Sequence, residues 1–528
     1  MRVRLTMPKQ LLLKKADFFP LGEFPPGADA LLIQDGLIAS LGRTRELIRI
    51  LDPTARVIDL KGRTVLPGFI DSHVHLAETG LLRQGVDLSE AEHIDQVLEM
   101  LSGAFPDRSR RDFFRAHSFD PGLMTSGRYP TRQELDAVSS RVPIFVLRRD
   151  GHSCVVNGAF LRHCELAPGT SGLEIDPRTG RPTGTLRAQA LELARACRNR
   201  LLGEEDRQEA VRDACRQAVR RGVTTLHAVC GRIEDVELLD RLAGELPLEV
   251  VPYPNTTDVE AVTARGWPRV GGDILVDGSL GSHTAALLEP YADRPGERGQ
   301  LYLTRRQLVD LIGPAHASGL QVSLHAIGDR AVEELLAALE EVLTAHPRGD
   351  HRHRIEHAEL LHPDQIERIA RQGIVLAVQP AFEAFWGGPG GMYASRLGPE
   401  RIQRTNPFRQ LLDAGIVLAG GSDSPITPID PLAGMAAAIG HPDRRHRLSV
   451  MEAAHLFTTG GAKASFQEDG KGLIRKGWRA DLVVLSRDPR RVPAEEIGRI
   501  PIHMVICGGR IVATETAQEN PVETAKKK

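Results

Sequence analysis

The 528-residue sequence lacks the features that would crosslink it, hold it in a membrane or give it a strong charge. Its six cysteines include no Cys-x-x-Cys pair, which indicates reduced thiols rather than a disulfide framework or zinc cluster. There is no run of about 18 apolar residues, and the first ten residues lack the apolar core of a signal peptide. We therefore expect a cytoplasmic protein with no membrane contact.

Signals for nucleic acid and for nucleotide cofactors are also missing. The formal net charge is -2, so the charge balance does not favour nucleic acid as a partner. Neither GGPGG nor GSLGSH forms a GxGxxG motif after a strand, and GxxxxGK[ST] does not occur. The composition, 41% hydrophobic and 26% charged, does support a large packed core. A small molecule is therefore the expected partner.

Short apolar runs alternate with helix-like stretches from residue 64 onward. The runs are Thr64–Asp71, Gly222–Val229, Leu248–Pro254, Asp273–Gly278, Leu320–Gly328, His353–Glu359, Gly373–Pro380 and Gly415–Asp423. Continuous apolar strands, each followed by a helix, indicate a parallel sheet that is covered on its outer side. Eight such units predict an α/β protein of the (β/α)8 or TIM-barrel class, with its active site at the C-terminal ends of the strands.

Three further segments set the expected domain organisation. Residues from about 77 to 201 are too many for one connection, so we expect an insertion after the first strand that emerges at the catalytic face. Residues 1–63 and 461–528 are rich in short strands and turns. They predict the two parts of a small β-sandwich built from both termini. The barrel itself is then expected over residues 64–460.

The first strand, in LPGFIDSHVHL, ends in two histidines one residue apart. Side chains at positions i and i+2 of a strand point to the same face, so His73 and His75 converge on one point. Two converging imidazoles indicate a shared metal ion. The alternative is that both rings are hydrogen-bonded at the end of a strand.

Other strands present similar side chains where they end. His325 follows from the fifth strand, His357 from the sixth and Asp423 from the eighth. Four imidazoles and a carboxylate at one barrel mouth predict a divalent transition metal, with zinc the first candidate. Asp423 is also the candidate general base and acid, which would accept a proton from water and deliver it to a leaving nitrogen. The alternative for Asp423 is a turn or N-cap residue in GGSDSP.

The sequence also resembles the metal-dependent amidohydrolase superfamily, and within it the YtcJ-like and N-substituted formamide deformylase-like group (amidohydrolase family 3). The segments that carry the resemblance are LPGFIDSHVHL, RRDGHSCVVN, GRPTGTL, LVDGSLGSHTAALLEPYAD, LHAIGDRAV, HRIEHAEL, GGSDSPITPIDPL and GWRADLVVLSRDP. The resemblance implies a hydrolase acting on carbon–nitrogen bonds other than peptide bonds, with His73, His75, His325, His357 and Asp423 as metal ligands. A homodimer would be unsurprising in such a family.

The sequence departs from the pattern of the resembled family at two positions. Many members have a lysine four residues before Asp277, which bridges two metals when it is carboxylated, whereas this chain has Asp273 there. Because aspartate is too short to replace that lysine unless the backbone moves, one ion is favoured. Asp273 could otherwise neutralise a neighbouring cation, or another carboxylate or cysteine could replace the bridge. His283 stands where relatives commonly have arginine.

Further candidates are expected to contact the substrate. His152 matches a DGH element of the resembled family, which suggests a catalytic contact from the insertion or, with equal weight, a turn-stabilising role. His227, His283 and Asp277 are candidate substrate-binding residues, although His227 could instead pack in the core and Asp277 could hold its loop. The segment after the seventh strand is either a lid or a surface loop; its aromatic residues are Phe382, Phe385, Trp386 and Tyr393, of which Trp386 is the candidate substrate contact.

The leading functional hypothesis is hydrolysis of a small non-peptide amide, formamide or cyclic amide by metal-activated hydroxide. One alternative is an ester hydrolase or a deaminase on the same barrel, because the fold alone does not decide the reaction. Another is a catalytically silent relative that serves as a scaffold. Loss of metal ligands would be the mark of such a scaffold, and all the expected ligands are present.

Overall fold

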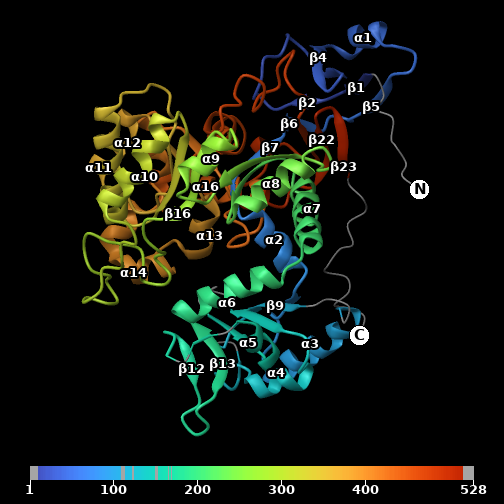
Figure 1. Cartoon of the computed structure of the whole chain (residues 1–528). Helices are drawn as coiled ribbons and strands as arrows, with labels where there is room; N and C mark the ends of the chain where they lie inside the picture. The colour runs from blue at the N-terminus through green and yellow to red at the C-terminus, as the bar shows by residue number, and fades with distance from the viewer. Residues whose placement is uncertain are drawn as a thin grey trace. The chain divides into compact units, whose positions relative to one another are not determined.

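The computed structural model describes residues 10–108, 113–121, 124–148, 153–164, 166–167 and 169–514 (Figure 1). Two compact units make up the chain: Met1–Leu76 together with Cys215–Lys528, and Ala77–Ala214. None of the helices in the described ranges has both the length and the apolar character needed to cross a bilayer.

The first unit contains parallel strands that overlap all of the predicted apolar runs. They are β7 (Phe69–Val74), β14 (Val223–Cys230), β15 (Glu249–Pro254), β16 (Arg269–Leu275), β17 (Gln321–Ala326), β18 (Arg354–His357), β19 (Val375–Val378) and β20 (Leu418–Gly420). Within the described chain they form two sheets, with strand orders β15-β14-β7 and β16-β17-β18-β19-β20. The fold is therefore α/β, as predicted.

The hydrogen-bond ladder of these strands is not closed within the described ranges. An isolated parallel bridge between Val74 and Ser424 connects the end of β7 with the segment after β20. At the opposite edge no ladder links β15 to β16 in the part of the chain that the structure describes. The register of β16 against β17 also shifts between Val270 and Ile274, which marks a bulge on the strand at this edge.

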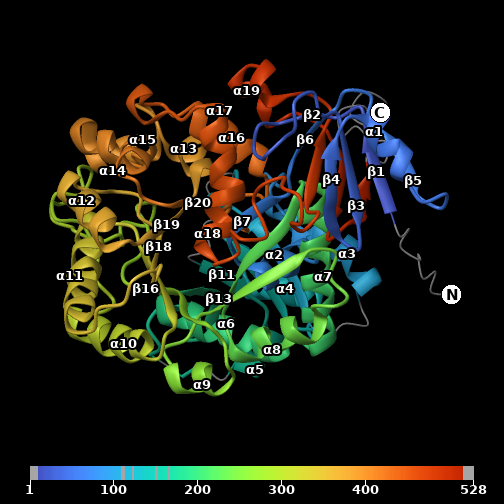
Figure 2. The ribbon, with the colours of Figure 1, turned by 90° about the horizontal axis from the view of Figure 1, so that it is seen from above.

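Burial explains why the strands are continuously apolar. Every residue of β7, β14, β17, β18, β19 and β20 is buried, as expected for parallel strands that are covered on both faces. Helices α10 (Arg305–Ala317), α11 (Asp329–Ala345) and α12 (Pro363–Gln372) lie side by side along the five-stranded sheet (Figures 1 and 2). The inner face of α11 buries Leu335, Leu336, Leu339 and Val342.

The remaining helices of this unit fill the connections between strands and the C-terminal region. Helix α7 (Glu204–Arg220) crosses the boundary between the units and belongs to this one from Cys215 onward. The others are α8 (Ile233–Leu242), α9 (Val259–Ala264), α13 (Pro380–Trp386), α14 (Met392–Arg401), α15 (Phe408–Asp413), α16 (Pro431–Ile439), α17 (Val450–His455), α18 (Gly461–Ala464) and α19 (Ala494–Ile497), with the short helical turns η2 (Ile402–Arg404), η3 (Arg444–His446), η4 (Leu456–Gly460) and η5 (Pro489–Arg491).

Strands from the two ends of the described chain lie side by side (Figure 2). The N-terminal elements are β1 (Gln10–Lys14), β2 (Asp17–Phe18), β3 (Ala30–Gln34), β4 (Leu37–Gly42), α1 (Thr44–Leu47), η1 (Ile48–Ile50), β5 (Arg56–Asp59) and β6 (Thr64–Pro67), and the C-terminal ones are β21 (Leu482–Leu485), β22 (Ile502–Cys507) and β23 (Arg510–Thr514). They form the sheets β4-β3-β1-β5 and β2-β6-β21-β22-β23. Leu13 and Ile33 share a hydrophobic core with Leu482 and Ile506.

The second unit has its own sheet, with the order β12-β13-β11-β10-β9-β8. Its elements are α2 (Leu76–Arg83), β8 (Val86–Asp87), α3 (Ile94–Arg108), β9 (Phe114–Phe119), α4 (Arg132–Val138), β10 (Ile144–Arg148), β11 (Ser153–Val156), α5 (Gly158–Cys164), β12 (Leu173–Ile175), β13 (Pro182–Arg187) and α6 (Ala188–Leu201). The sheet packs on apolar residues from α3 and α4 in one core, and from α5 and α6 in another.

The prediction that all thiols are reduced is wrong for one pair. Cys164 and Cys197 form a disulfide between α5 and α6, with their Cα atoms 5.4 Å apart. Their separation of 33 residues gives no recognisable spacing signal, and only the packing of the two helices brings them within bonding distance. The other cysteines, Cys154, Cys215, Cys230 and Cys507, are free and buried.

Candidate metal centre

The two histidines of the first parallel strand lie together, as their spacing predicts. His73 is fully buried in β7, and His75 follows the strand with its side chain 29% exposed. Their ring centroids are 5.3 Å apart. The segment after β20 runs against them, because Asp423 donates its backbone N–H to the His73 carbonyl and His75 donates to the Ser424 carbonyl.

A glycine permits this close approach. A Cβ atom on Gly421 would lie 2.7 Å from the backbone nitrogen of His73, so a larger residue would push the segment after β20 away from β7. The approach places Asp423 beside the histidine pair. Its Oδ1 lies 3.3 Å from Nε2 of His73 and 3.1 Å from Nε2 of His75.

Strands β17 and β18 bring in the other two predicted histidines, His325 and His357, beside Asp273 from β16. Oδ1 of Asp273 lies 3.5 Å from Nδ1 of His325 and 3.5 Å from Nε2 of His357. Oδ2 of the same carboxylate lies 3.6 Å from Nε2 of His75. The structure therefore brings the five predicted ligands together and adds Asp273 between them.

Two sets of three ligand atoms are close enough to share an ion. One set comes from His73, Asp273 and His357, and the other from His73, His75 and Asp423; within each set the ligand atoms lie within 4.8 Å of one another. His73 belongs to both. Imidazole nitrogens and carboxylate oxygens in such small groups are the donors that zinc and related divalent ions prefer.

The hydrogen bonds on the outer side of the rings support the same conclusion. Nδ1 of His73 lies 2.6 Å from Oε2 of Glu356, Nδ1 of His357 lies 2.8 Å from Oε1 of Gln379, and Nε2 of His325 lies 3.3 Å from the Gly278 carbonyl. These acceptors take the N–H of each ring and leave the other nitrogen with a lone pair that faces the group.

The inner atoms lack hydrogen-bond partners among the described residues. Nε2 of His73, Nδ1 of His325 and Oδ1 of Asp273 are buried and unpaired there. A buried polar atom without a partner costs free energy, which coordination to a cation would offset. The residues present thus fit a divalent metal.

The charges of the group also suit a cation. Burial by itself lowers the pKa of His73, but Asp273, Asp423 and Glu356 raise it well above its usual value. Burial raises the pKa of Asp273, yet the facing imidazoles hold it well below its usual range. The carboxylates of Asp273, Asp423 and Glu356 therefore favour a positive charge in the space between them and the histidines.

Two of the grouped residues have a backbone conformation that side chains rarely adopt. His357 has φ 72° and Asp423 has φ 54°, both in the left-handed region. Non-glycine residues in this region are uncommon, and they concentrate at functional sites that the surrounding structure holds in place. Both residues lie at or just after the C-terminal end of a strand, where the active site was predicted.

Sequence reasoning missed the residues that hold the histidines. Glu356, which precedes His357 in β18, binds Nδ1 of His73 through its carboxylate. Arg354 in turn donates to both oxygens of Glu356 and to the Ser72 carbonyl. The sequence signal for this network is the alternation in RIEH, which sends Arg354 and Glu356 to the face opposite His357.

The predicted substrate-binding residue His227 lies in this same network. It is 1% exposed, and Nη1 of Arg354 lies 3.2 Å from its Nδ1. Burial, with the nearby Arg354 cation, lowers the pKa of His227 well below its usual value. The structure thus places His227 in the packing position that was the alternative to a cavity position.

Asp277 and His283 also have partners of their own. Asp277 is fully buried and accepts backbone N–H groups from Ala286, Ile327 and Gly328, so it anchors the loop after β16. Nε2 of His283 lies 3.1 Å from Oδ2 of Asp293. Neither Asp277 nor His283 contributes an atom to the two candidate ligand sets described above.

The segment after β19 is helical over much of its length. Phe382 and Tyr393 are buried in a core cluster, whereas Phe385 is 61% exposed and Trp386 is partly buried. The ring of Phe382 lies 6.2 Å from that of His357 and 4.8 Å from that of Trp386. Phe385 and Trp386 are thus the aromatic residues of this segment that retain surface. His152, the predicted catalytic residue of the insertion, lies outside the described residues.

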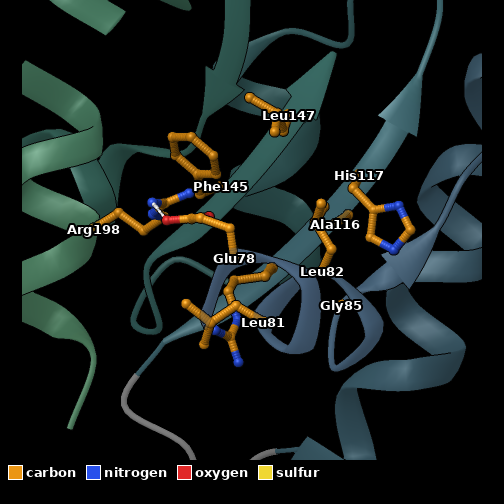
Figure 3. Close-up of a pocket in the computed structure, with 10 residues that line it drawn as sticks. Glu78, Leu81, Leu82, Gly85, Ala116, His117, Phe145, Leu147 and Arg198 are labelled. Atoms are coloured by element: carbon orange, nitrogen blue, oxygen red, sulfur yellow. Dashed lines mark hydrogen bonds and ion pairs between the residues drawn. The ribbon is translucent and has the colours of Figure 1, made fainter. Parts of the chain in front are cut away.

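A separate pocket in the second unit does not belong to this group (Figure 3). It is lined by Leu81, His117 and Phe145, among others, and by the pair in which Arg198 donates to Glu78. Its volume is about 20 Å³. That is room for about one water molecule, so this pocket is no candidate for a substrate site.

Imidazoles and carboxylates are grouped at the C-terminal ends of parallel strands in an α/β fold, an arrangement that fits a metal-dependent enzyme. Comparison with known proteins agrees. Residues 56–513 match the family model described as amidohydrolase family. The chain therefore belongs to the amidohydrolase family, and the predicted enzyme class, a metal-dependent amidohydrolase acting on carbon–nitrogen bonds, is confirmed.

Individual relatives cover nearly the whole chain. YtcJ of Bacillus subtilis (strain 168) is 30% identical over 516 residues, which cover 92% of this chain and 96% of YtcJ. The N-substituted formamide deformylase of Arthrobacter pascens is 26% identical over 519 residues, 92% of this chain and 95% of the relative. The crystal structure of an uncharacterized metal-dependent hydrolase from Pyrococcus furiosus is 30% identical, with a TM-score of 0.78, and covers 91% of this chain and 100% of that chain.

Proposed function

We propose that the protein hydrolyses a carbon–nitrogen bond in a small non-peptide amide, formamide or cyclic amide. The observation that carries the proposal is the meeting of five predicted ligands from β7, β17, β18 and the segment after β20, with Asp273 between them. The similarity to an N-substituted formamide deformylase supports an amide of this size and class. The catalytically silent scaffold is disfavoured, because none of the predicted ligands is missing from the group.

We also propose that the parallel strands form the (β/α)8 barrel expected from the sequence, over residues 64–460. The bridge between Val74 and Ser424 supports a join between β7 and β20. The likeness to the Pyrococcus furiosus hydrolase over most of both chains supports the same fold. In this proposal residues 77–201 are an insertion, and residues 1–63 and 461–528 form a terminal β-sandwich around the shared core of the terminal sheets.

His73, His75, His325, His357 and Asp423 would hold the divalent ion, and zinc is the first candidate for this set of nitrogen and oxygen donors. Such an ion supplies Lewis-acid chemistry, since it lowers the pKa of water towards 7 and polarises a carbonyl group. Glu356 and Gln379 keep His73 and His357 in the tautomers that present Nε2 to the site.

Asp423 is the residue that we assign to proton transfer. Its Oδ1 faces His73 and His75, and its backbone is held beside β7 by the hydrogen bond from the Asp423 N–H to the His73 carbonyl. Water adds to the carbonyl carbon, and Asp423 accepts the proton that the water loses. Asp423 then returns this proton to the nitrogen as the carbon–nitrogen bond breaks, which gives a carboxylic acid and an amine.

The nature of the leaving group explains why the chain needs this proton donor. An amine leaves poorly as an anion, so protonation of the nitrogen must accompany bond cleavage. An ester oxygen leaves more readily and depends less on such a donor. The assignment of Asp423 as proton donor to the leaving group thus favours an amide substrate over an ester.

The function can be tested with the full chain reconstituted with zinc. We expect release of amine from one or more N-substituted formamides or cyclic amides in a panel that also contains matched esters and amidines. Asp423→Asn should abolish this activity, while Asp364→Asn, at an exposed position of α12, should retain it. Turnover of esters or amidines without turnover of any amide would overturn the proposal in favour of the corresponding alternative.

A further inference from the structure

We propose that Asp273 bridges two divalent ions in this centre, one on each oxygen of its carboxylate. The inference rests on the proposed metal-dependent function. It requires two ions, whereas the sequence favours one. In this arrangement a side chain of the protein itself takes the place of the carboxylated lysine that many members of the resembled family have.

The two oxygens of Asp273 face different histidines. Oδ1 lies 3.5 Å from Nδ1 of His325 and 3.5 Å from Nε2 of His357. Oδ2 lies 3.6 Å from Nε2 of His75 and 4.0 Å from Nε2 of His73. The carboxylate therefore stands between two histidine pairs and presents one oxygen to each.

These distances match two ligand atoms on a common ion. Nitrogen and oxygen ligands lie about 2.1 Å from zinc, so two of them at the corners of a tetrahedron are about 3.4 Å apart. The contacts of Oδ1 with His325 and His357 have this spacing, and the contacts of Oδ2 with His75 and His73 are close to it. Each oxygen can thus share an ion with its own histidine pair.

The two sets of donors are unequal. His73, His75 and Asp423 together with Oδ2 of Asp273 would supply four donors to one ion. His325 and His357 together with Oδ1 supply three to the other. Catalytic zinc sites have three protein ligands and one open position, so the ion held by His325, His357 and Asp273 would be the one with room for water or substrate.

The backbone of β16 is irregular just before Asp273. Between Val270 and Ile274 this strand advances four residues while β17 advances from Val322 to Leu324. The bulge contains Gly271 and Gly272, with φ 96° and 59°. Side chains rarely adopt such angles, so the two glycines permit the bulge just before Asp273.

The space around the bulge is equally restricted. A Cβ atom on Gly271 would lie 2.3 Å from the Ser323 carbonyl oxygen, and one on Gly272 would lie 2.8 Å from the backbone of Asn255. The bulge thus fits between β17 and the end of β15 only as glycine. It displaces the backbone beside Asp273, the kind of change that a shorter side chain would need.

Burial gives an independent reason for a cation beside Oδ1 of Asp273. The residue is 8% exposed, and its Oδ1 has no hydrogen-bond partner among the described residues. An ionised carboxylate buried without donors is strongly disfavoured. An ion held by His73, His75 and Asp423 alone would leave Oδ1 unpaired, so an ion on the Oδ1 side is needed to satisfy it.

The bridge can be tested without substrate. Full-length protein, Asp273→Ala, Asp273→Asn and the control Asp364→Asn are stripped of metal, reconstituted with excess zinc and analysed for zinc per chain. The same proteins loaded with Mn²⁺ are analysed by electron paramagnetic resonance for magnetic coupling between two ions. Circular dichroism shows whether each variant folds, and Asp273→Asn keeps the shape of the side chain if the alanine variant does not fold.

We expect two zinc ions per chain and coupled manganese in the parent and in Asp364→Asn. Both Asp273 variants should bind the second ion at least about 10-fold more weakly and lose the coupling. One zinc per chain in the saturated parent, or coupling that survives in both variants, would overturn the bridge. Two coupled ions in a protein that hydrolyses no amide would leave the bridge intact and overturn the proposed function alone.

Discussion

The carboxylate of Glu356 binds Nδ1 of His73 at 2.6 Å, 283 residues away in the sequence. Both side chains are fully buried, and Glu356 is held in turn by Arg354. A carboxylate that accepts the outer N–H of a metal-binding histidine fixes the ring and raises its basicity. Glu356 is therefore a positioning residue for the centre, although its side chain lies on the opposite face from His357.

Glu356→Gln should weaken metal binding in the folded protein. The amide is no longer an anion, so His73 loses a charged acceptor, and we expect zinc affinity to fall by about 10- to 100-fold. Competition with a chromophoric chelator measures this affinity directly. Glu367→Gln, an exposed position on α12, is the matched control and should leave the affinity unchanged. Equal affinities in the two variants would show that Glu356 has a structural role alone.

Asp423→Asn should separate proton transfer from substrate binding. The amide cannot accept a proton from water, so kcat should fall by about 100-fold or more, while KM changes little. Steady-state kinetics with zinc present at saturation measures both constants, and zinc analysis shows whether the variant still carries its ions. A kcat close to that of the parent would remove Asp423 from the role of general base.

Gly271→Ala should displace the bulge of β16 and with it Asp273. The added Cβ atom would lie 2.3 Å from the Ser323 carbonyl, so we expect a loss of stability and of one zinc per chain. Gly266→Ala is the matched control, because Gly266 has φ +68° but open space around it. It should cost about 1 to 2 kcal/mol through backbone strain alone and keep its zinc. The contradictory outcome is a Gly271→Ala protein with the zinc content of the control.

A second group of histidines, away from the proposed ligands, should make stability depend on pH. Nε2 of His316 lies 2.7 Å from the His346 carbonyl, and its Nδ1 lies 2.9 Å from Nε2 of His353. Nδ1 of His353 accepts the Val322 backbone N–H at 3.0 Å. Each nitrogen is used once as donor or acceptor, which requires both rings to be neutral.

Burial lowers the pKa of His316 and His353, and the neighbouring Arg348 lowers both further. His351 packs against the same rings and its pKa is also lowered by burial, although Asp350 opposes the shift. The unfolded chain therefore binds more protons than the folded chain once the pH falls below about 6.5. The stabilisation from the neutral rings is complete above that pH and is lost as the pH falls further.

Denaturant unfolding between pH 8 and 5 tests this dependence. The free energy of unfolding of the parent should fall across the acid part of the range, and His353→Gln should have a shallower dependence because one of the titrating groups is gone. The exposed His346→Gln should follow the parent. Identical pH dependence in the parent and His353→Gln would show that His353 is not one of the groups that couple stability to pH.

The strands and the grouping of the five predicted residues could be inferred from the sequence because each depends on short-range pattern. Continuous apolar runs marked the parallel strands, and the i, i+2 spacing of His73 and His75 fixed their common face. His325, His357 and Asp423 could be added because C-terminal ends of parallel strands meet at one edge. None of these inferences required knowledge of how distant segments pack.

The roles of Asp273 and Glu356 could not be predicted in this way. Asp273 reaches the group through a bulge, and two adjacent glycines in a strand do not show in which direction the chain is displaced. Glu356 acts across the sheet on His73, a contact between β18 and β7 that follows from packing alone. The pairing of Cys164 with Cys197 depends likewise on how α5 and α6 lie together.

The most direct test of the central claim is a zinc titration of metal-free protein, with amine release from an N-substituted formamide or cyclic amide as the readout. The account predicts no release without zinc, a rise as zinc is added and a plateau when the centre is full. Hydrolysis at the same rate by the metal-free protein would contradict it, because His73, His75, His325, His357 and Asp423 would then have no metal-dependent role in the reaction.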